Sequence, residues 1–372
     1  MPPSDTDPGP RSPLSRDCRE QTAADGPGPR AMFCMRLLLV AAQAATILLT
    51  WRVWQVRSFP PLLPLLPVPQ VPMAWPLLAT LGLAAVAPRA GVPAHAATLL
   101  WAIVADQCRM QPHVISLATL LWGTTGLAGG TIVMRAALVA LWFYAGLHKL
   151  LSPDFYVRSG PLFLQAAWPG APAGLAAPLA AAVAITEMAL ATGSLLPRVR
   201  RAVGVAAAAV HVAFVLLLAL RLGWDRPVWP WNAALACVAP AVLLHWRGRG
   251  LGAGWSIAPR AARWAAGVLL VLPAGYWLGV VDAFLAHAVY SDDRPRAFVC
   301  TPFSRTDVNA ICDRHGVVLP PAHRLCAPFF RGVGNPGEWL EVEDPRWIAR
   351  ARGYDRRKIF WNDLARDPPP AW

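Results

Sequence analysis

The stretch R-A-A-L-V-A-L-W-F-Y-A-G-L-H-K-L-L-S-P-D, residues 135–154, decides the fold of this chain. Its apolar part is long enough to cross a bilayer and ends in two adjacent titratable residues, His148 and Lys149. Of the 34 basic residues in the chain, only Lys149 and Lys358 are lysines. An ionisable residue in a membrane segment is costly and is therefore a hypothesis for a functional site. The stretch predicts a membrane helix with a functional lysine near its end.

The composition of the whole chain agrees with a membrane protein. Of its 372 residues, 56% are hydrophobic and 15% are charged, with a mean hydropathy of +0.40, whereas soluble domains are about 25% charged. Alternating strands of the β-barrel type are absent. We therefore expect an all-α polytopic membrane protein, a bundle of about eight or nine transmembrane helices with a small extracytoplasmic C-terminal domain. The net charge of +13 does not indicate nucleic acid as a partner, because the arginines fall in connections and in the tail, where topology and acidic lipids account for them.

The chain divides into three predicted parts. Residues 1–30 are rich in Pro, Gly, Ser and Asp, which predicts a disordered cytoplasmic tail rather than a signal peptide. Residues 31–287 form the transmembrane bundle. Residues 288–372 form the small extracytoplasmic C-terminal domain, in which Leu340-Glu-Val-Glu343 is a candidate strand and partial disorder is the alternative.

The bundle contains nine predicted spans. The connection 58–73 contains six prolines, so we expect it to be irregular and to lie at the interface or re-enter. The basic residues around 198–201 and 247–263 place those connections in the cytoplasm, which puts the N-terminus inside and the C-terminus outside. The predicted spans are 33–54, 74–88, 93–107, 113–129, 132–151, 174–196, 201–221, 230–246 and 264–286.

Lys149 has two interpretations. A lysine at a helix end can extend to the lipid headgroups, where the negative end of the helix dipole also favours it. A lysine held in a low dielectric instead releases its proton more readily and can act as a base. His148 cannot share its face, because adjacent helix residues point about 100° apart, whereas Tyr144 can lie beneath His148.

Two further polar residues lie in the middle of predicted spans. Glu187 is the only glutamate between residues 31 and 287, and it must be protonated or paired there, with Lys149, His211 or an arginine as the partner. His211 follows a run of alanines, which lets another helix approach closely. For both residues, a structural hydrogen bond between helices is the alternative to a functional role.

Two clusters lie at predicted span ends. Asp106, Arg109 and Gln111 form the first cluster; Asp106 and Arg109 can pair at i, i+3, and Pro112 is expected to stop the helix. Trp229, Trp231 and Asn232 form the second, which is typical of an interfacial aromatic belt. Capped helix ends are the simpler interpretation of both clusters.

These motifs together resemble a known family. D-Q-x-R-x-Q-P at 106–112, W-F-Y-A-G-L-H-K-L at 142–150, Glu187, His211 and V-W-P-W-N at 228–232 occur in this order. Over roughly residues 33–290 the chain is similar to HTTM-domain membrane proteins, which are related to vitamin K-dependent gamma-glutamyl carboxylase. DoxX-like quinone-linked membrane proteins are also similar to some members.

The resemblance implies a chemistry and a set of site residues. By the match to the A-G-x-K-K-L stretch of the carboxylase, Lys149 is the base that deprotonates a hydroquinone, and His148 replaces the neighbouring lysine. The implied catalytic set also includes Glu187 and His211, and the two span-end clusters are the implied substrate-binding residues. The cofactor is unknown, with a quinone-type lipid expected. Only about 85 residues follow the last span, whereas the carboxylase has a large lumenal region, so a peptide substrate does not follow from the resemblance.

The tail carries one further constellation. Cys312 and His315, together with His323 and Cys326, have a spacing that suits a tetrahedral zinc site. A disulfide among Cys300, Cys312 and Cys326 and the absence of any linkage are the alternatives. The seven cysteines are too sparse for a disulfide scaffold.

Two hypotheses for function follow. The first is a membrane enzyme, of carboxylase or oxidoreductase type, that acts on a quinone-like or other lipophilic substrate with Lys149 as base. The second is a non-catalytic membrane partner or assembly factor that acts through its C-terminal tail. Transport is a weaker third hypothesis, because the sequence has no inverted repeat.

Overall fold

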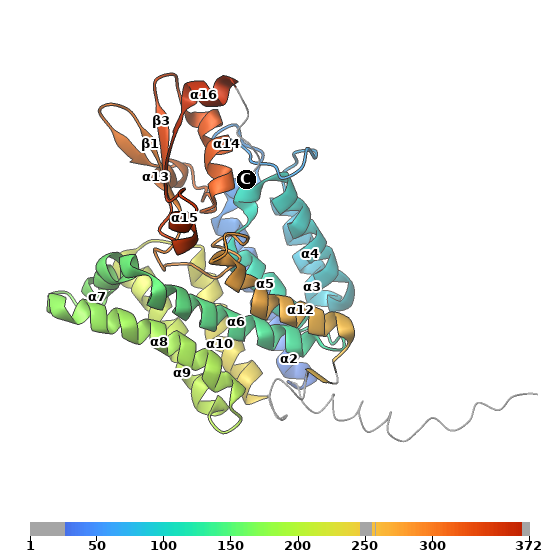
Figure 1. Cartoon of the computed structure of the whole chain (residues 1–372). Coiled ribbons are helices and arrows are strands. Elements are labelled where there is room, and N and C mark those ends of the chain that lie inside the picture. Colours follow the sequence, from blue (N-terminus) through green and yellow to red (C-terminus); the bar gives the residue numbers. More distant parts are fainter. Residues whose placement is uncertain (1–26, 246–254, 257, 367–372) are drawn as a thin grey trace, which may run out of the picture.

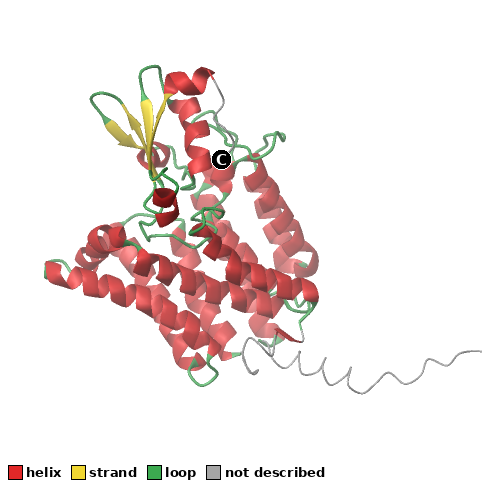
Figure 2. Cartoon of the chain, in the orientation of Figure 1, coloured by secondary structure: helices red, strands yellow, loops and turns green. Residues whose placement is uncertain are grey.

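The computed structural model describes residues 27–245, 255–256 and 258–366. In these residues the chain is mostly helical, and a small sheet lies near the C-terminus (Figure 2). Of the predicted N-terminal tail, residues 1–26 lie outside the described residues. The first helix already begins at Pro29, so the end of that tail was predicted too late.

Among the described residues, nine longer helices belong to the bundle, and Figure 1 shows how they are arranged. They are α2 (Pro29–Leu49), α3 (Ala74–Val86), α4 (Pro88–Ala105), α5 (Pro112–Trp122), α6 (Gly130–Leu151), α8 (Ala176–Leu195), α9 (Arg200–Leu216), α10 (Val228–Leu244) and α12 (Arg260–Val271). Short elements connect them: η1 (Trp51–Trp54), η2 (Gln107–Arg109), η3 (Phe155–Ser159), α7 (Gly160–Ala167), η4 (Ala173–Leu175), η5 (Leu217–Leu222) and η6 (Leu272–Tyr276).

Four helical stretches among the described residues are long and apolar enough to cross a membrane. Three other apolar helices, α3, α5 and α10, are shorter. The chain therefore has the helical elements of a membrane protein. The four long stretches are Pro29–Leu49, Gly130–Leu151, Ala173–Leu195 and Arg200–Leu222.

Proline and glycine set several helix boundaries. Pro88 and Pro112 occupy the first turns of α4 and α5, where the missing N–H has no helical partner to lose. Pro112 was expected to stop a helix and instead opens one, because α4 has already ended at Ala105. Gly129 precedes α6 with φ at 82°, a left-handed conformation that glycine adopts without strain.

The predicted span 264–286 is wrong in its second half. The helix ends at Val271, passes into η6 and continues as irregular chain to residue 295. Pro273 has no N–H to donate to the carbonyl four residues earlier, which ends the α-helical pattern. Gly279 then takes a left-handed conformation with φ at 75°. An apolar composition had hidden this change of direction.

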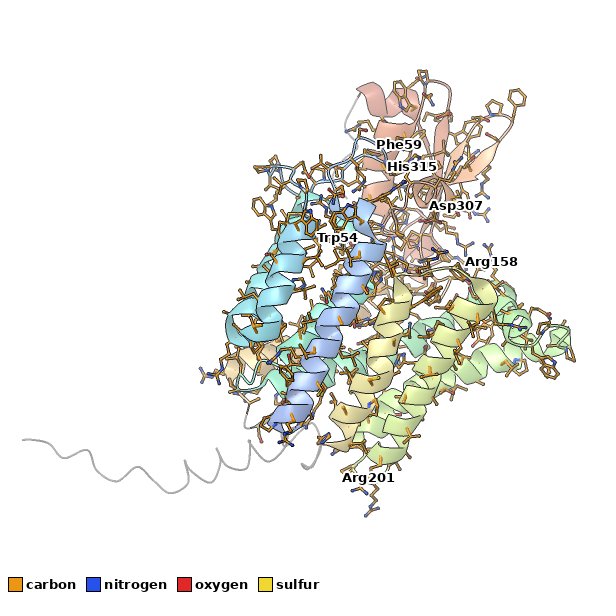
Figure 3. All side chains as sticks on the ribbon, turned by 180° about the vertical axis from the view of Figure 1, so that it is seen from behind. Trp54, Phe59, Arg158, Arg201, Asp307 and His315 are labelled. Atoms are coloured by element: carbon orange, nitrogen blue, oxygen red, sulfur yellow. The ribbon has the colours of Figure 1, made fainter. Side chains whose placement is uncertain are left out.

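The ends of the bundle differ in what they carry. Trp54, Phe59 and Arg158 lie at the end that faces the C-terminal residues, and Arg201 lies at the opposite end (Figure 3). The proline-rich connection 58–73 is irregular, as predicted. It lies against the C-terminal part of the chain, with the Phe59 ring 4.7 Å from the His315 ring.

The C-terminal residues form an antiparallel sheet, so the all-α expectation is wrong for this part. The strand order is β2-β1-β3-β4. In the candidate strand, Leu340 and Val342 are buried, while Glu341 and Glu343 are partly exposed. This alternation is typical of a half-buried strand. The strands are β1 (Arg296–Cys300), β2 (Arg305–Asp307), β3 (Trp339–Glu343) and β4 (Arg356–Phe360), and the helices beside them are α13 (Val308–Asp313), α14 (His323–Val333), α15 (Trp347–Ala351) and α16 (Trp361–Arg366).

We call residues 296–366 the C-terminal unit. Its buried side chains, among them Cys312, Phe329 and Phe330, belong to the same hydrophobic core as side chains of the bundle. Polar contacts cross the boundary as well, because Arg324 donates to Gln107 in η2 and pairs with Asp282. The unit is therefore packed directly on one end of the bundle.

Candidate functional site

One small cavity lies inside the bundle. Its volume is about 50 Å³, which is enough for a few water molecules and below the usual size of a pocket for an organic ligand. Residues from five helices and from the chain after η6 meet around it. The lining residues are Pro112, Leu141, Trp142, Ala145, Lys149, Glu187, Val210, His211, Phe214, Trp231, Asn232, His287, Val289 and Tyr290.

An ion pair between Lys149 and Glu187 forms one wall of the cavity. The Lys149 Nζ lies 2.7 Å from Glu187 Oε2 and 2.9 Å from Oε1, and it also donates to the Ala145 carbonyl at 3.3 Å. Lys149 is only 2% exposed. The amine therefore points back into the bundle and does not extend from the helix end to the surface.

Gly146 allows the two helices of this pair to approach. A Cβ atom at this position would lie 2.6 Å from the Ala184 carbonyl oxygen of α8 and 3.0 Å from the Met188 backbone nitrogen. α6 and α8 run antiparallel beside each other (Figure 1). Because side chains lean toward the N-terminus of their own helix, those of Lys149 and Glu187 lean toward each other.

A hydrogen-bonded chain fixes His211 on another wall. Trp142 Nε1 donates to His211 Nε2 at 3.1 Å, and His211 Nδ1 lies 2.8 Å from Asn232 Oδ1. These partners assign the hydrogen to Nδ1, because an indole nitrogen can only donate. Asn232 in turn donates to the Val228 carbonyl at 3.1 Å. Both ring nitrogens of His211 are thus engaged, which suits a residue that positions the wall.

The segment after η6 covers the cavity. His287 and Tyr290 line it and both have left-handed backbone conformations, each with φ at 60°, which is strained for residues other than glycine. The Tyr290 hydroxyl donates to Asp225 in the connection between α9 and α10, and Asp225 is itself left-handed with φ at 54°. Asp292 accepts from the Ser159 hydroxyl at 2.5 Å. The cover is therefore tied down on both sides of the cavity.

His148 lies on the other side of α6, as the helix geometry predicted. Its ring stacks on Trp277 with centroids 4.5 Å apart, and its Nδ1 is 3.7 Å from Asp293 Oδ2. Tyr144 lies on the same face, with its ring centroid 6.1 Å from that of Trp277. The structure thus places His148 against the chain after η6 and does not bring it to the cavity.

The cluster of Asp106, Arg109 and Gln111 lies apart from the cavity. Asp106 pairs with Arg57 at 2.6 Å and, as predicted, with Arg109 at 3.9 Å. Arg109 donates to the Val53 carbonyl at 3.1 Å, and Gln111 donates to the Cys108 carbonyl at 2.6 Å. This cluster fastens η1 and the proline-rich connection to the end of α4, which is a structural role.

Of the two tryptophans in the second cluster, only Trp231 lies at the cavity. Trp231 and Asn232 line the cavity, and the Trp231 indole donates to the Ser116 hydroxyl at 3.1 Å. Trp229 does not line it and donates to the Trp224 carbonyl at 3.1 Å. The sequence had grouped all three residues because they share one helix start.

The zinc site, one of the three alternatives for the cysteines and histidines of the tail, does not assemble. The described residues contain no group of three or more ligands that could hold a metal ion. His323 instead bonds to Asp344 at 2.7 Å, and the His315 ring packs on Phe59. The disulfide alternative is also wrong, because Cys300, Cys312 and Cys326 are free thiols.

Asp344 is the best-satisfied carboxylate of the C-terminal unit. Burial would raise its pKa, but hydrogen bonds from His323 and Arg346 outweigh burial and lower the pKa to about 2. Arg346 also donates to the Tyr276 carbonyl at 3.1 Å. This network joins the C-terminal unit to η6, from which the cavity cover follows.

Three cavity residues with hydrogen-bonding side chains, Trp142, His287 and Tyr290, were not predicted as site residues. Trp142 lies seven residues before Lys149, so the helical period would have placed both on one face. His287 and Tyr290 follow the last predicted span and carry no periodic signal. Their position depends on the turn after η6, which only the structure gives.

Comparison with protein-family models, with curated proteins and with solved structures gave no match.

Proposed function

We propose that this chain is an integral membrane protein of the HTTM type in which the Lys149–Glu187 pair takes a proton from a lipophilic, quinol-like substrate. The observation that carries the proposal is the 2.7 Å ion pair on the same cavity as His211 and Asn232. A buried ion pair stabilises a fold little compared with apolar residues of the same volume. A chemical role is the better reason for its presence inside a membrane bundle.

The pair can accept one proton without creating a net negative charge. The Lys149 ammonium passes a proton to the Glu187 carboxylate, and the free amine then takes the hydroxyl proton of the substrate. The pair ends as an ammonium beside a neutral carboxylic acid, with one positive charge. The oxyanion of the substrate carries the balancing negative charge, so attraction between the two favours the transfer in a low dielectric.

The exposure of Glu187 supports access from the lipid. Its side chain is 15% exposed, against 3% for Lys149. It belongs to a stretch, Ala173–Leu195, of which only 22% is buried inside the protein. The cavity of about 50 Å³ is too small to enclose a ring. We therefore infer that a hydroxyl group reaches the pair from the α8 side while the rest of the substrate stays in the bilayer.

The proposed topology has nine crossings. It counts the four long stretches, the helices α3, α4, α5 and α10, and a ninth crossing that begins with α12 and is completed by η6 and the irregular chain after it. Arg201 at one end of the bundle marks the cytoplasmic side by the positive-inside rule (Figure 3). The C-terminal unit, at the other end, is then extracytoplasmic and the N-terminus is cytoplasmic.

A titration of a lipophilic hydroquinone tests the proposal. Purified protein in lipid nanodiscs is mixed with the hydroquinone without oxygen, and the ultraviolet difference spectrum reports formation of the quinolate. The wild-type protein should give one quinolate per chain. Lys149→Arg keeps the cation and its pairing with Glu187 but cannot release a proton, because a guanidinium stays protonated, so it should give no quinolate.

The outcomes separate the roles in the pair. Full quinolate formation by Lys149→Arg would overturn Lys149 as the base and leave Glu187 as the acceptor. Loss of quinolate formation in both Glu187→Gln and Lys149→Arg supports a role for the two residues as one unit. Lys358→Arg is the control, because Lys358, the other lysine of the chain, lies on strand β4. This variant should form as much quinolate as the wild type.

Exposed aromatic residues favour the second candidate function, a non-catalytic partner. Phe303 is 97% exposed and Phe360 is 50% exposed on the C-terminal unit. Deletion of residues 290–372 cannot separate the candidates, because Tyr290 lines the cavity. Point variants can: if the partner role is correct, Phe303→Ser with Phe360→Ser abolishes cellular function and Lys149→Arg leaves it intact.

A further inference from the structure

A groove follows the outer side of α12. Its volume is about 600 Å³, within the range of sites for organic ligands. The residues along it are Trp255, Arg260, Arg263, Trp264, Gly267, Val268 and Val271. The other side of α12 packs on α6, where Ala266 joins Ile132 and Ala136 in a small core. The groove is therefore an outward-facing feature, separate from the cavity at Lys149.

Two tryptophans and one glycine shape the groove. A Cβ atom on Gly267 would lie 3.3 Å from the ring of Trp255, so the absence of a side chain there gives this ring its place. Trp264 is 74% exposed. Exposed tryptophans of this kind are enriched where a protein meets the membrane–water interface.

Charge and apolar surface are separated along the groove. Arg260 and Arg263 occupy the first turn of α12 and lie on one face at i, i+3. Val268 and Val271, which are 49% and 69% exposed, follow toward the end of the helix. The helix rises about 16 Å from its first to its last residue. A ligand that fits has an anionic group at one end and an apolar chain at the other.

The two arginines lack acidic partners in the part of the chain that the structure describes. No ion pair involves either guanidinium in residues 27–245, 255–256 and 258–366. The sequence from 246 to 263 contains no Asp or Glu that could supply one. Two cations beside an apolar groove are complementary to an anionic lipid headgroup.

We propose that this groove binds one anionic phospholipid, with the phosphate at Arg260 and Arg263 and an acyl chain along Gly267, Val268 and Val271. The order of charge and apolar surface favours this occupant over a second copy of the chain, because the one acidic residue within the nine described bundle helices, Glu187, already pairs with Lys149. The proposal needs the chain to lie in a membrane but does not depend on the chemistry at Lys149.

Native mass spectrometry of the purified full-length chain tests the site. Delipidated protein in mild detergent is titrated with phosphatidylglycerol and, separately, with phosphatidylcholine. The first bound lipid should be phosphatidylglycerol. Each basic residue near a membrane surface contributes about a factor of five, so Arg260→Gln with Arg263→Gln should weaken that first binding about thirty-fold. Val268→Trp, which fills the groove, should weaken binding of both lipids.

The control is Arg350→Gln with Arg352→Gln, the same change at two exposed arginines of the C-terminal unit, and it should leave binding unchanged. Equal binding of both lipids by the wild type, or no loss in Arg260→Gln with Arg263→Gln, would overturn the proposal. Saturation by glycerol phosphate alone would overturn the acyl-chain contact. A dimer that persists in place of lipid binding would assign the groove to a second copy. Quinolate formation at Lys149 is measured in parallel, and its loss or retention does not bear on this site.

Discussion

Removal of one partner of the Lys149–Glu187 pair is the most direct test of the site geometry. Glu187→Gln leaves the ammonium of Lys149, which is 2% exposed, without its counter-ion. Lys149→Met leaves a carboxylate that is 15% exposed and can be solvated or protonated more easily. The double variant, Lys149→Met with Glu187→Gln, removes both charges and keeps similar volumes. The structure therefore predicts unequal single effects and recovery in the double variant.

The magnitude follows from the burial of the ammonium. Breaking a buried ion pair costs about 3–5 kcal/mol, because one charge stays uncompensated. Glu187→Gln should therefore lower the free energy of unfolding by an amount in this range, and Lys149→Met should lower it by less. Replacing both partners is often neutral, so the double variant should lie within about 1 kcal/mol of the wild type. The coupling energy from the double-mutant cycle should be at least about 2 kcal/mol, whereas exposed pairs give about 0.2–1 kcal/mol.

Thermal unfolding in nanodiscs, followed by the fluorescence of the 18 tryptophans, measures these differences. A cost of 3–5 kcal/mol corresponds to about 6–10 °C at about 2 °C per kcal/mol, the value for larger domains. Glu343→Gln is the matched control, because Glu343 pairs with Arg305 at 2.6 Å on an exposed surface, and it should shift the midpoint by less than about 2 °C. Additive single effects, or a Glu187→Gln midpoint equal to that of the wild type, would refute the buried pair.

Three further predictions follow from the structure. Gly146→Leu should push α8 away from α6, because even a Cβ atom would lie 2.6 Å from the Ala184 carbonyl oxygen. The variant should lower both the melting midpoint and quinolate formation. Gly82→Leu is the control, because no atom lies within 4 Å of the added Cβ. The pKa of Asp344 is lowered from 3.8 to about 2, so its carboxylate adds about 2 kcal/mol to the free energy of unfolding above pH 4, and this is lost as the pH falls toward 2. In Asp344→Asn, the stability of the C-terminal unit should therefore fall less steeply with decreasing pH. Tyr290→Phe removes the hydrogen bond to Asp225 and should raise hydrogen exchange in residues 286–292, whereas Tyr156→Phe, at an exposed hydroxyl that bonds to the Leu150 carbonyl, should not.

The positions of the helices were largely accessible from the sequence. Long apolar runs placed α2, α6, α8 and α9 to within a few residues, except that α2 begins and ends earlier than predicted. The break after Val271 was not accessible, because the apolar composition continues through residue 286 and hides the change of direction at Pro273. Only one strand of the sheet was predicted, because buried and exposed residues alternate clearly in β3. The other strands, β1, β2 and β4, are recognised only by their pairing within the sheet.

The site was accessible in part. Lys149 was identified as the one lysine of the predicted bundle in an arginine-rich chain, and helix geometry separated it correctly from His148. The partner of Glu187 was not fixed, because Lys149, His211 and several arginines were all compatible with the sequence. The choice depends on which helices touch, and Gly146 decides that contact. The ion pair of Asp106 with Arg109 was predicted, but the shorter one with Arg57 was missed, since Arg57 is distant in the sequence and reaches Asp106 through an irregular connection.

Asp106 and Glu187, two carboxylates of the bundle, differ in how many of their acceptor positions are used. Asp106 is 0% exposed, accepts from the backbone nitrogens of Leu63 and Cys108 through one oxygen, and pairs with Arg57 through the other. The hydrogen bonds that the described residues donate to Glu187 both come from Lys149, although a carboxylate offers about four acceptor positions. Glu187 also faces the cavity and is partly exposed. Among the described residues, the spare capacity for a hydrogen bond or a proton therefore lies at Glu187, and under the proposed function a substrate hydroxyl that reaches the pair meets an acceptor with free positions.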